Sequence, residues 1–177
     1  MASESSRRKP SLSRAAEHVF VGVGGGIAGT VYGTVVTMAT LTAAYATEKH
    51  PWKLAGIVVT TSVVLWIAHI YAHGLAASIE KSGRLRRSEL AALLRRELGI
   101  VFAAAAPTVA LLLGAAKVFT ETRAIWLALA IGLVTLGVEG LRFARLEKLG
   151  TLGTLVAVSA NLALGLAIVA LKVEVAH

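Results

Sequence analysis

Five long apolar stretches recur along this chain of 177 residues, separated by short polar segments. A helix needs about 20 mainly apolar residues to cross the hydrocarbon core of a bilayer, and each stretch is close to or above that length. The sequence therefore predicts an all-α integral membrane bundle with the lipid bilayer as its first partner. The five expected transmembrane helices are residues 19–46, 54–77, 98–118, 124–141 and 152–171.

Composition supports this fold class and narrows the chemistry. Hydrophobic residues make up 56% of the chain and the mean hydropathy is +0.73, which is too apolar for a soluble domain of this size. The chain has no Cys, Asp or Gln, and all ten acidic residues are Glu. Motifs for a phosphate loop, a nucleophile elbow or paired catalytic carboxylates are not visible. We therefore expect neither an enzyme nor a bound cofactor.

The distribution of charge predicts a topology. Residues 1–17 are basic and Ser-rich, so we expect a disordered cytoplasmic tail before a transmembrane domain of residues 18–177. If the N-terminus is inside, 13 of the 18 Lys and Arg residues lie on the cytoplasmic side. This bias predicts that the C-terminus is outside. The Ala-, Val- and Leu-rich composition points to a bacterial cytoplasmic membrane.

The most basic segment, residues 78–97, lies between the second and third stretches. Its arginines Arg84, Arg86 and Arg87 could bind lipid head groups or serve only as a topology signal. Ser88 is a candidate cap for a helix that continues into the third span. The net charge of +8 is not gathered with aromatic side chains, so we expect no nucleic-acid partner.

The second stretch carries a stripe of polar and ionisable side chains. Residues three, four and seven apart share one face of a helix. Ionisable groups within a membrane helix mark a candidate functional site. The members of this stripe, which we call the polar stripe below, are Ser62, Trp66, His69, His73 and Glu80.

Glu139 in the fourth stretch lies at the same expected depth as His69. We therefore expect Glu139 to pair with His69 or His73 in an ion or proton site, with Arg142 as the competing partner. His69 and His73 are also spaced to share one metal ion. The pattern leaves three interpretations open for the two histidines: structural hydrogen bonding, a proton relay or pH sensor, and metal binding.

A second polar layer is expected near the membrane midplane. Thr30 and Asn161 fall at this level, and Pro107 should bend the third span there. Asn161 could hydrogen-bond between helices or contact a substrate.

Gly25, Gly29 and Gly33 form a row of small residues on the first span. Such a row lets a second helix approach closely, and we expect it to be the seam of a homo-oligomer. The spacing alone does not distinguish packing between chains from packing within one chain.

Two functions follow from these patterns. The leading one is transport, by a small cation or proton permeation protein of the ion-channel or transporter type. The alternative is a non-transporting membrane assembly or lipid-interacting protein, whose buried polar groups only fix how its helices pack.

Overall fold

The computed structural model describes residues 12–80 and 86–175, with side chains described for residues 26–79 and 86–170. It is 91% helical and contains no strand in the described part. All five helices have segments long and apolar enough to cross a membrane. They are α1 (Leu12–Thr47), α2 (Pro51–Glu80), α3 (Arg87–Ala115), α4 (Glu121–Leu146) and α5 (Thr151–Val175).

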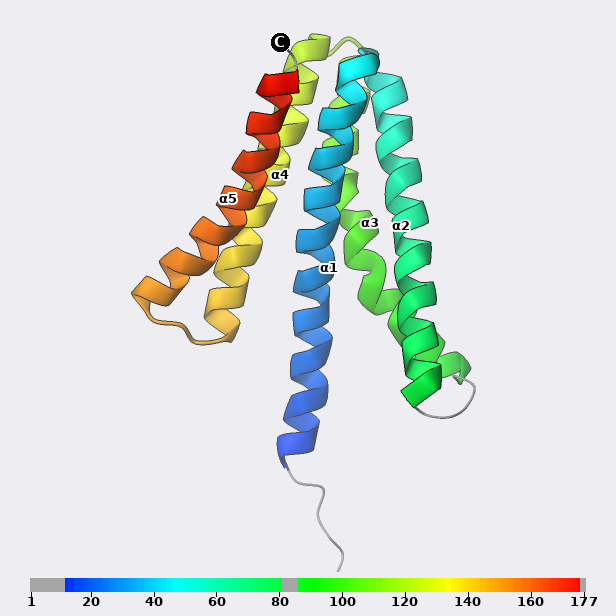
Figure 1. The fold of residues 1–177 in the computed structure, drawn as a ribbon, viewed down its shortest axis with the longest axis vertical. Helices are drawn as coiled ribbons and strands as arrows, with labels where there is room; N and C mark the ends of the chain where they lie inside the picture. The colour runs from blue at the N-terminus through cyan, green and yellow to red at the C-terminus, as the bar shows by residue number, and fades with distance from the viewer. Residues whose placement is uncertain (1–11, 81–85, 176–177) are drawn as a thin grey trace, which may run out of the picture.

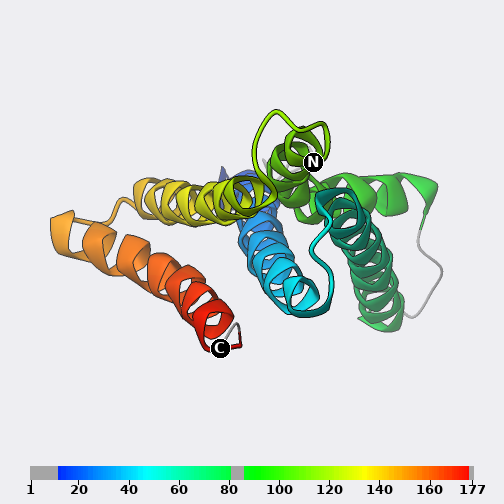
Figure 2. The ribbon, with the colours of Figure 1, turned by 90° about the horizontal axis from the view of Figure 1, so that it is seen from above.

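The helices alternate in direction along the bundle (Figure 1). Turns between α1 and α2 and between α3 and α4 lie at one end, which we call the turn end. The other end carries the beginning of α1 and the connections between α2 and α3 and between α4 and α5. In both views α1 stands between the α2–α3 pair and the α4–α5 pair (Figures 1 and 2).

The packing is uneven. α3 packs against α1, α2 and α4, whereas α5 lies mainly on α4, and α2 scarcely touches α4. The main apolar cluster lies near the turn end and draws residues from each of α1, α2, α3 and α4, such as Met38, Leu54, Leu111 and Leu129. Away from the turn end the two helix pairs spread apart (Figure 1). Beyond this apolar cluster, ionisable side chains of α2 and α3 come together.

Helix boundaries differ from the expected spans in two places. α1 begins at Leu12, so part of the segment expected as a disordered tail is helical, while residues 1–11 lie outside the described residues. α3 begins at Arg87 rather than near residue 98. Its N-cap residue is Arg86, not Ser88, and the Glu89 carboxylate accepts a hydrogen bond from the Arg86 backbone N–H at 3.0 Å.

Two lysines occupy the αL turns found in the described part of the chain. Lys117 after α3 has a φ of 61° and Lys148 after α4 has a φ of 52°. In each case the next residue's N–H bonds back to the helix, Val118 to Leu113 and Leu149 to Ala144, which closes a Schellman turn. A cation there also complements the negative end of the helix dipole.

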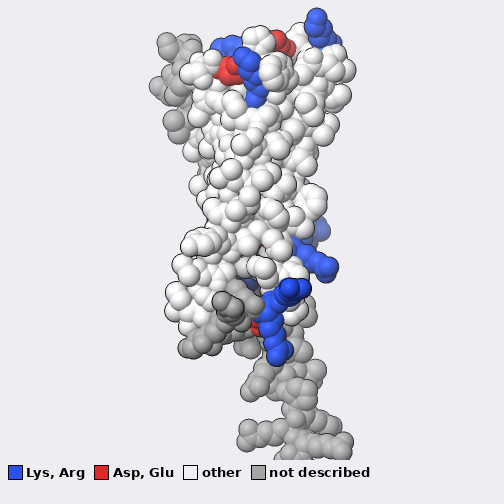
Figure 3. Space-filling model, turned by 90° about the vertical axis from the view of Figure 1, so that its right-hand side faces the viewer, with Lys and Arg blue, Asp and Glu red and all other residues white. Residues whose placement is uncertain are grey.

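Charged side chains are unevenly distributed along the bundle axis. On the face drawn in Figure 3, Lys, Arg and Glu gather at the two ends, and the band between them carries no charge. Long apolar side chains are exposed along α2 and α5, among them Val64, Ile67, Leu155 and Val156. Exposed apolar surface between two charged ends is what a bilayer requires.

Candidate functional site: a histidine–carboxylate cluster between three helices

The polar stripe on α2 runs from the interior of the bundle at Ser62 to its surface at His73. Ser62 is buried, Trp66 and His69 are half-buried, and His73 opens toward the surface with 47% of its side chain exposed. The side chain of Glu80 lies outside the described residues. The expectation that these residues share one helix face is consistent with their packing toward α1 and α3.

His69 lies in a short column of rings. Its ring centroid is 4.9 Å from that of Tyr32 on α1 and 5.6 Å from that of His73 one turn along α2. Both ring pairs are tilted, by 39° and 44°. Among the described residues, neither ring nitrogen of His69 has a hydrogen-bond partner within the protein.

Glu97 of α3 completes the cluster. Its side chain is only 6% exposed, and its Oε1 lies 3.9 Å from His73 Nδ1 and 3.8 Å from Arg96 Nε. Both distances are too long for direct hydrogen bonds, but they place a guanidinium and an imidazole beside a buried carboxylate. We call His69, His73, Glu97 and Tyr32 the histidine–carboxylate cluster.

The tautomer of His73 follows from its backbone partner. His73 Nδ1 lies 3.1 Å from the carbonyl oxygen of His69. Because a carbonyl oxygen only accepts, Nδ1 carries a proton in this hydrogen bond. The Nε2 atom of His73 is then the position at which the ring gains or loses its second proton.

Two buried polar atoms extend the cluster toward the turn end. Trp66 Nε1 on α2 and Thr108 Oγ1 on α3 are buried without a hydrogen-bond partner. Glu97 meets His73, and a Cβ on Gly114 would lie 3.6 Å from Pro51. This antiparallel register puts Thr108 level with residues 57–62 of α2. Unpaired buried polar groups usually hold ordered water.

The expected pairing of Glu139 with the histidines is wrong. Glu139 is buried on α4, and its carboxylate accepts two hydrogen bonds from Arg142 Nη1, at 2.8 and 3.1 Å. The depth estimate fixed a height along the membrane axis but not a direction around the bundle. Since α2 and α4 scarcely touch, a shared depth does not bring Glu139 to His69.

The expected midplane residues lie in two separate contacts. Thr30 Oγ1 donates to the Gly26 carbonyl at 2.9 Å and faces Gly99 on α3. Asn161 Nδ2 donates to the Leu136 carbonyl at 3.3 Å and so links α5 to α4. The hydrogen-bonding interpretation of Asn161 agrees with this contact.

The glycine row packs within the chain. A Cβ on Gly33 would lie 2.7 Å from the Ile100 Cα and carbonyl oxygen, and one on Gly29 would lie 3.8 Å from Ile100. α3 therefore occupies this face, which corrects the expectation of a seam between copies. The surroundings of Gly25 lie outside the described residues.

The remaining expected sites are on the surface or incomplete. Arg86 and Arg87 are exposed at the start of α3, and Arg84 lies outside the described residues. In the described part of the chain, no three His or Glu side chains are grouped so that they could hold a metal ion. His69 and His73 alone supply two donors, fewer than a closed zinc site uses.

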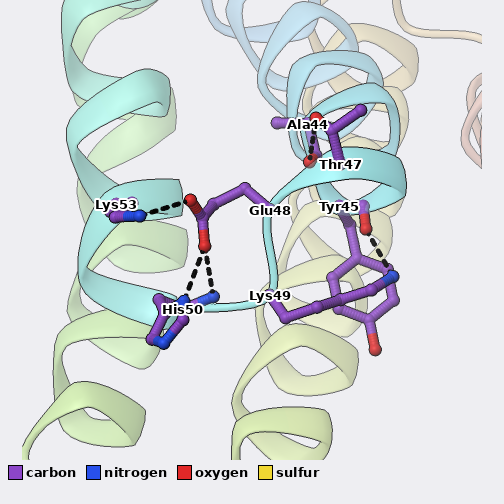
Figure 4. A network of polar contacts seen from close by, with 7 residues as sticks. All are labelled: Ala44, Tyr45, Thr47, Glu48, Lys49, His50 and Lys53. Atoms are coloured by element: carbon purple, nitrogen blue, oxygen red, sulfur yellow. Dashed lines mark hydrogen bonds and ion pairs between the residues drawn. The ribbon is translucent and has the colours of Figure 1, made fainter.

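A second polar cluster lies at the turn end, outside the spans (Figure 4). Glu48 Oε2 is 2.9 Å from Lys53 Nζ, and Glu48 Oε1 accepts from the His50 backbone N–H at 2.9 Å and contacts His50 Nδ1 at 2.8 Å. Lys53 and the two His50 contacts lower the pKa of Glu48 to about 2. This carboxylate ties the α1–α2 turn to the start of α2.

Glu97 is the functional candidate that sequence reasoning missed. It stands one residue before the expected third span, in a segment that reads as a basic loop. Its signal is the run from Arg87 to Glu97, whose Leu, Ala, Arg and Glu residues favour helix. Extending the helix through this run brings Glu97 within the bundle.

The described residues thus form an all-helical bundle with five membrane-length helices, in which a buried carboxylate lies close to a histidine. Comparison with protein-family models, with curated proteins and with solved structures found no match.

Proposed function

We propose that this protein conducts protons or small cations across a membrane, and that Glu97, His73 and His69 form its ion-handling site. The observation that carries the proposal is the buried Glu97 carboxylate facing His73 from a neighbouring helix. Burying an ionisable group in a membrane bundle costs free energy, so such a group is by default a candidate functional site. A carboxylate beside an imidazole supplies two kinds of group that can bind and release a proton or hold a cation.

The shape of the cluster favours one direction of entry. His73 is open to the surface, whereas Glu97 and Ser62 are buried. An ion or proton would meet His73 first and then Glu97 and His69. The unpaired Trp66 and Thr108 atoms would continue the path by holding water between α2 and α3. We assign no catalytic residue and no enzymatic step to this path.

The proposal includes an orientation. With the N-terminal end of α1 in the cytoplasm, the cluster lies near the inner surface and the turn end lies outside. The excess of Lys and Arg at the N-terminal end supports this arrangement. We also propose that copies associate, because one chain leaves His73 open at its edge; the contact would involve faces other than the glycine row.

A structural role is the second candidate. Asn161 and Glu139 both have partners that fix helix positions, Leu136 and Arg142. If Glu97 acts in the same way, the protein is a non-transporting assembly or lipid-interacting factor. The two functions differ in whether removing the histidines changes a flux.

Reconstituted liposomes test the proposal. The purified protein is placed in vesicles with a trapped pH dye, and proton entry is followed after a potential is imposed; potassium and divalent-cation entry are measured in parallel. We expect flux in the native protein that is lost in His69→Ala/His73→Ala while helix content and detergent-solubilised mass are kept. Absence of flux at every pH and potential, with the protein folded, would favour the structural function.

A further inference from the structure

A pocket at the turn end has features unrelated to the histidine–carboxylate cluster. It lies between the start of α2 and the α3–α4 turn, and its volume is about 640 Å³. Small-molecule sites commonly enclose about 300–1,000 Å³. Its wall includes Trp52, Lys117, Phe119 and Arg123. We call it the turn-end pocket.

The charge of the pocket wall is available for a ligand. Lys117 and Arg123 form no ion pair with any described residue, and Glu121 is the carboxylate among the described lining residues. The nearby cations are already engaged, since Glu48 binds Lys53 at 2.9 Å and His50 at 2.8 Å. Two free cations thus face the pocket against one carboxylate at the first turn of α4, where the helix dipole stabilises it.

Lys117 both ends α3 in an αL turn and lines the turn-end pocket. An αL position at a helix end suits glycine, because a side chain there is strained. Lysine at this position complements the dipole of α3, which Lys148 does equally for α4. Only Lys117 lines the pocket. The matched lysine at the other end of the bundle is therefore an internal control.

A groove with a mainly apolar surface shares Trp52 with the pocket. A second hollow of about 500 Å³ runs along the exposed side of α2 past Lys53, Gly56, Ile57 and Thr60, and Trp52 lines both hollows. Nothing lies within 4 Å of a Cβ placed on Gly56, so this part of the groove is open. Trp52 and Phe119 are 60% and 36% exposed, as aromatic side chains in a membrane interface commonly are.

We propose that the turn-end pocket binds the phosphate of an anionic phospholipid, with one acyl chain in the groove along α2. Lys117 and Arg123 would contact the phosphate, and Trp52 would lie against the glycerol region between the two hollows. The same phosphate chemistry is present in free inorganic phosphate. The groove beside Gly56 is the feature that favours the lipid as its source.

Native mass spectrometry of the detergent-purified full chain tests this site with phosphatidylglycerol and phosphatidylcholine as probes. We expect Lys117→Gly/Arg123→Gln to lose about 25-fold in affinity for phosphatidylglycerol, since each basic residue near an anionic surface contributes roughly fivefold. Lys117→Gly keeps the αL turn. Lys148→Gly, the matched control, should retain the native affinity. Equal retention by the native protein and the double variant, or an equal loss in Lys148→Gly, would overturn the proposal.

A second variant separates the two phosphate sources. Gly56→Leu adds a side chain to the groove at a position where a Cβ meets nothing within 4 Å, so it should weaken phosphatidylglycerol binding several-fold while helix content is unchanged. Binding of inorganic phosphate, measured by phosphorus NMR, should be weak and unaffected by this variant. Phosphate binding that depends on Lys117 and Arg123, together with lipid retention that ignores Gly56→Leu, would overturn the lipid as the occupant in favour of soluble phosphate.

Discussion

The carboxylate of Glu97 on α3 lies 3.9 Å from Nδ1 of His73 on α2, whereas Glu139, the second buried carboxylate among the described side chains, is bonded to Arg142 at 2.8 Å. The two glutamates are similarly buried, yet they differ in partner. Glu139 is held by a permanently charged guanidinium on its own helix. Glu97 lies 3.8 Å from Arg96 Nε on its own helix and also faces the imidazole of His73 on α2, so its contacts join two helices.

The Glu139–Arg142 pair should be structural. Arg142→Gln leaves the Glu139 carboxylate buried without its partner, and we expect the free energy of unfolding to fall by about 1–2 kcal/mol. In Glu139→Gln/Arg142→Gln the unpaired charge is gone, so part of the loss should return. Unfolding in detergent, followed by circular dichroism, measures the cycle. Additive losses in the double variant would show that the two side chains are not coupled.

The glycine row should be sensitive to size at one position and tolerant at another. Gly33→Ala places a Cβ against the Ile100 backbone at 2.7 Å, and overpacking of this kind costs about 1–3 kcal/mol. Gly29→Ala meets Ile100 at an ordinary 3.8 Å and should be nearly neutral.

Thermal unfolding of the two glycine variants checks this order, with Gly56→Ala as the open-surface control. Because α3 occupies the row, the detergent-solubilised mass of Gly33→Ala should equal that of the native protein. A lower oligomer mass in this variant, with stability unchanged, would return the row to an interface between copies.

Asn161 should anchor α5, which is otherwise largely exposed. Asn161→Ala removes the hydrogen bond to the Leu136 carbonyl, and such bonds in membrane proteins contribute about 0.6 kcal/mol and up to about 1.7 kcal/mol. Ser159→Ala on the exposed side of the same helix is the control. Chemical unfolding of both variants gives the difference, and equal stability would show that the amide contributes nothing to the hairpin.

Glu48 predicts an acid sensitivity at the turn end. Its pKa is lowered to about 2 from 4.5, so its stabilising contribution is complete above pH 4.5 and is lost as the pH falls toward 2. The effect should be small because Glu48 is at the surface, where water and salt screen its contacts. Glu48→Gln should lower the unfolding midpoint slightly at pH 7 and not at pH 2. An equal decrease at both pH values would contradict the ion-pair origin.

The five helices of this fold can be predicted from the sequence more completely than the contacts between them. Five apolar stretches predict five helices because a bilayer requires length and apolarity, which hydropathy reports directly. The stripe containing Ser62, His69 and His73 follows from helical spacing alone. Which helix faces that stripe does not follow, because packing depends on shape complementarity between helices distant in sequence.

The two errors at the candidate sites have this common cause. Glu139 and His69 share a depth, but α4 packs on α3 and α5 rather than on α2. Gly29 and Gly33 were expected between copies, but α3 takes the space they leave. Glu97 was also missed, because the third membrane span was expected to begin at residue 98, and the segment before it, with Arg95 and Arg96, reads as a basic loop.

Matched glutamate variants test the proposed function most directly. Proton flux into liposomes is measured for the native protein, Glu97→Gln and Glu139→Gln at equal protein content, with folding checked by circular dichroism. We predict that Glu97→Gln loses at least about tenfold in flux while Glu139→Gln keeps most of it, because only Glu97 faces His73. Native flux in Glu97→Gln, or equal losses in both variants, would contradict the assignment of the histidine–carboxylate cluster as the ion-handling site.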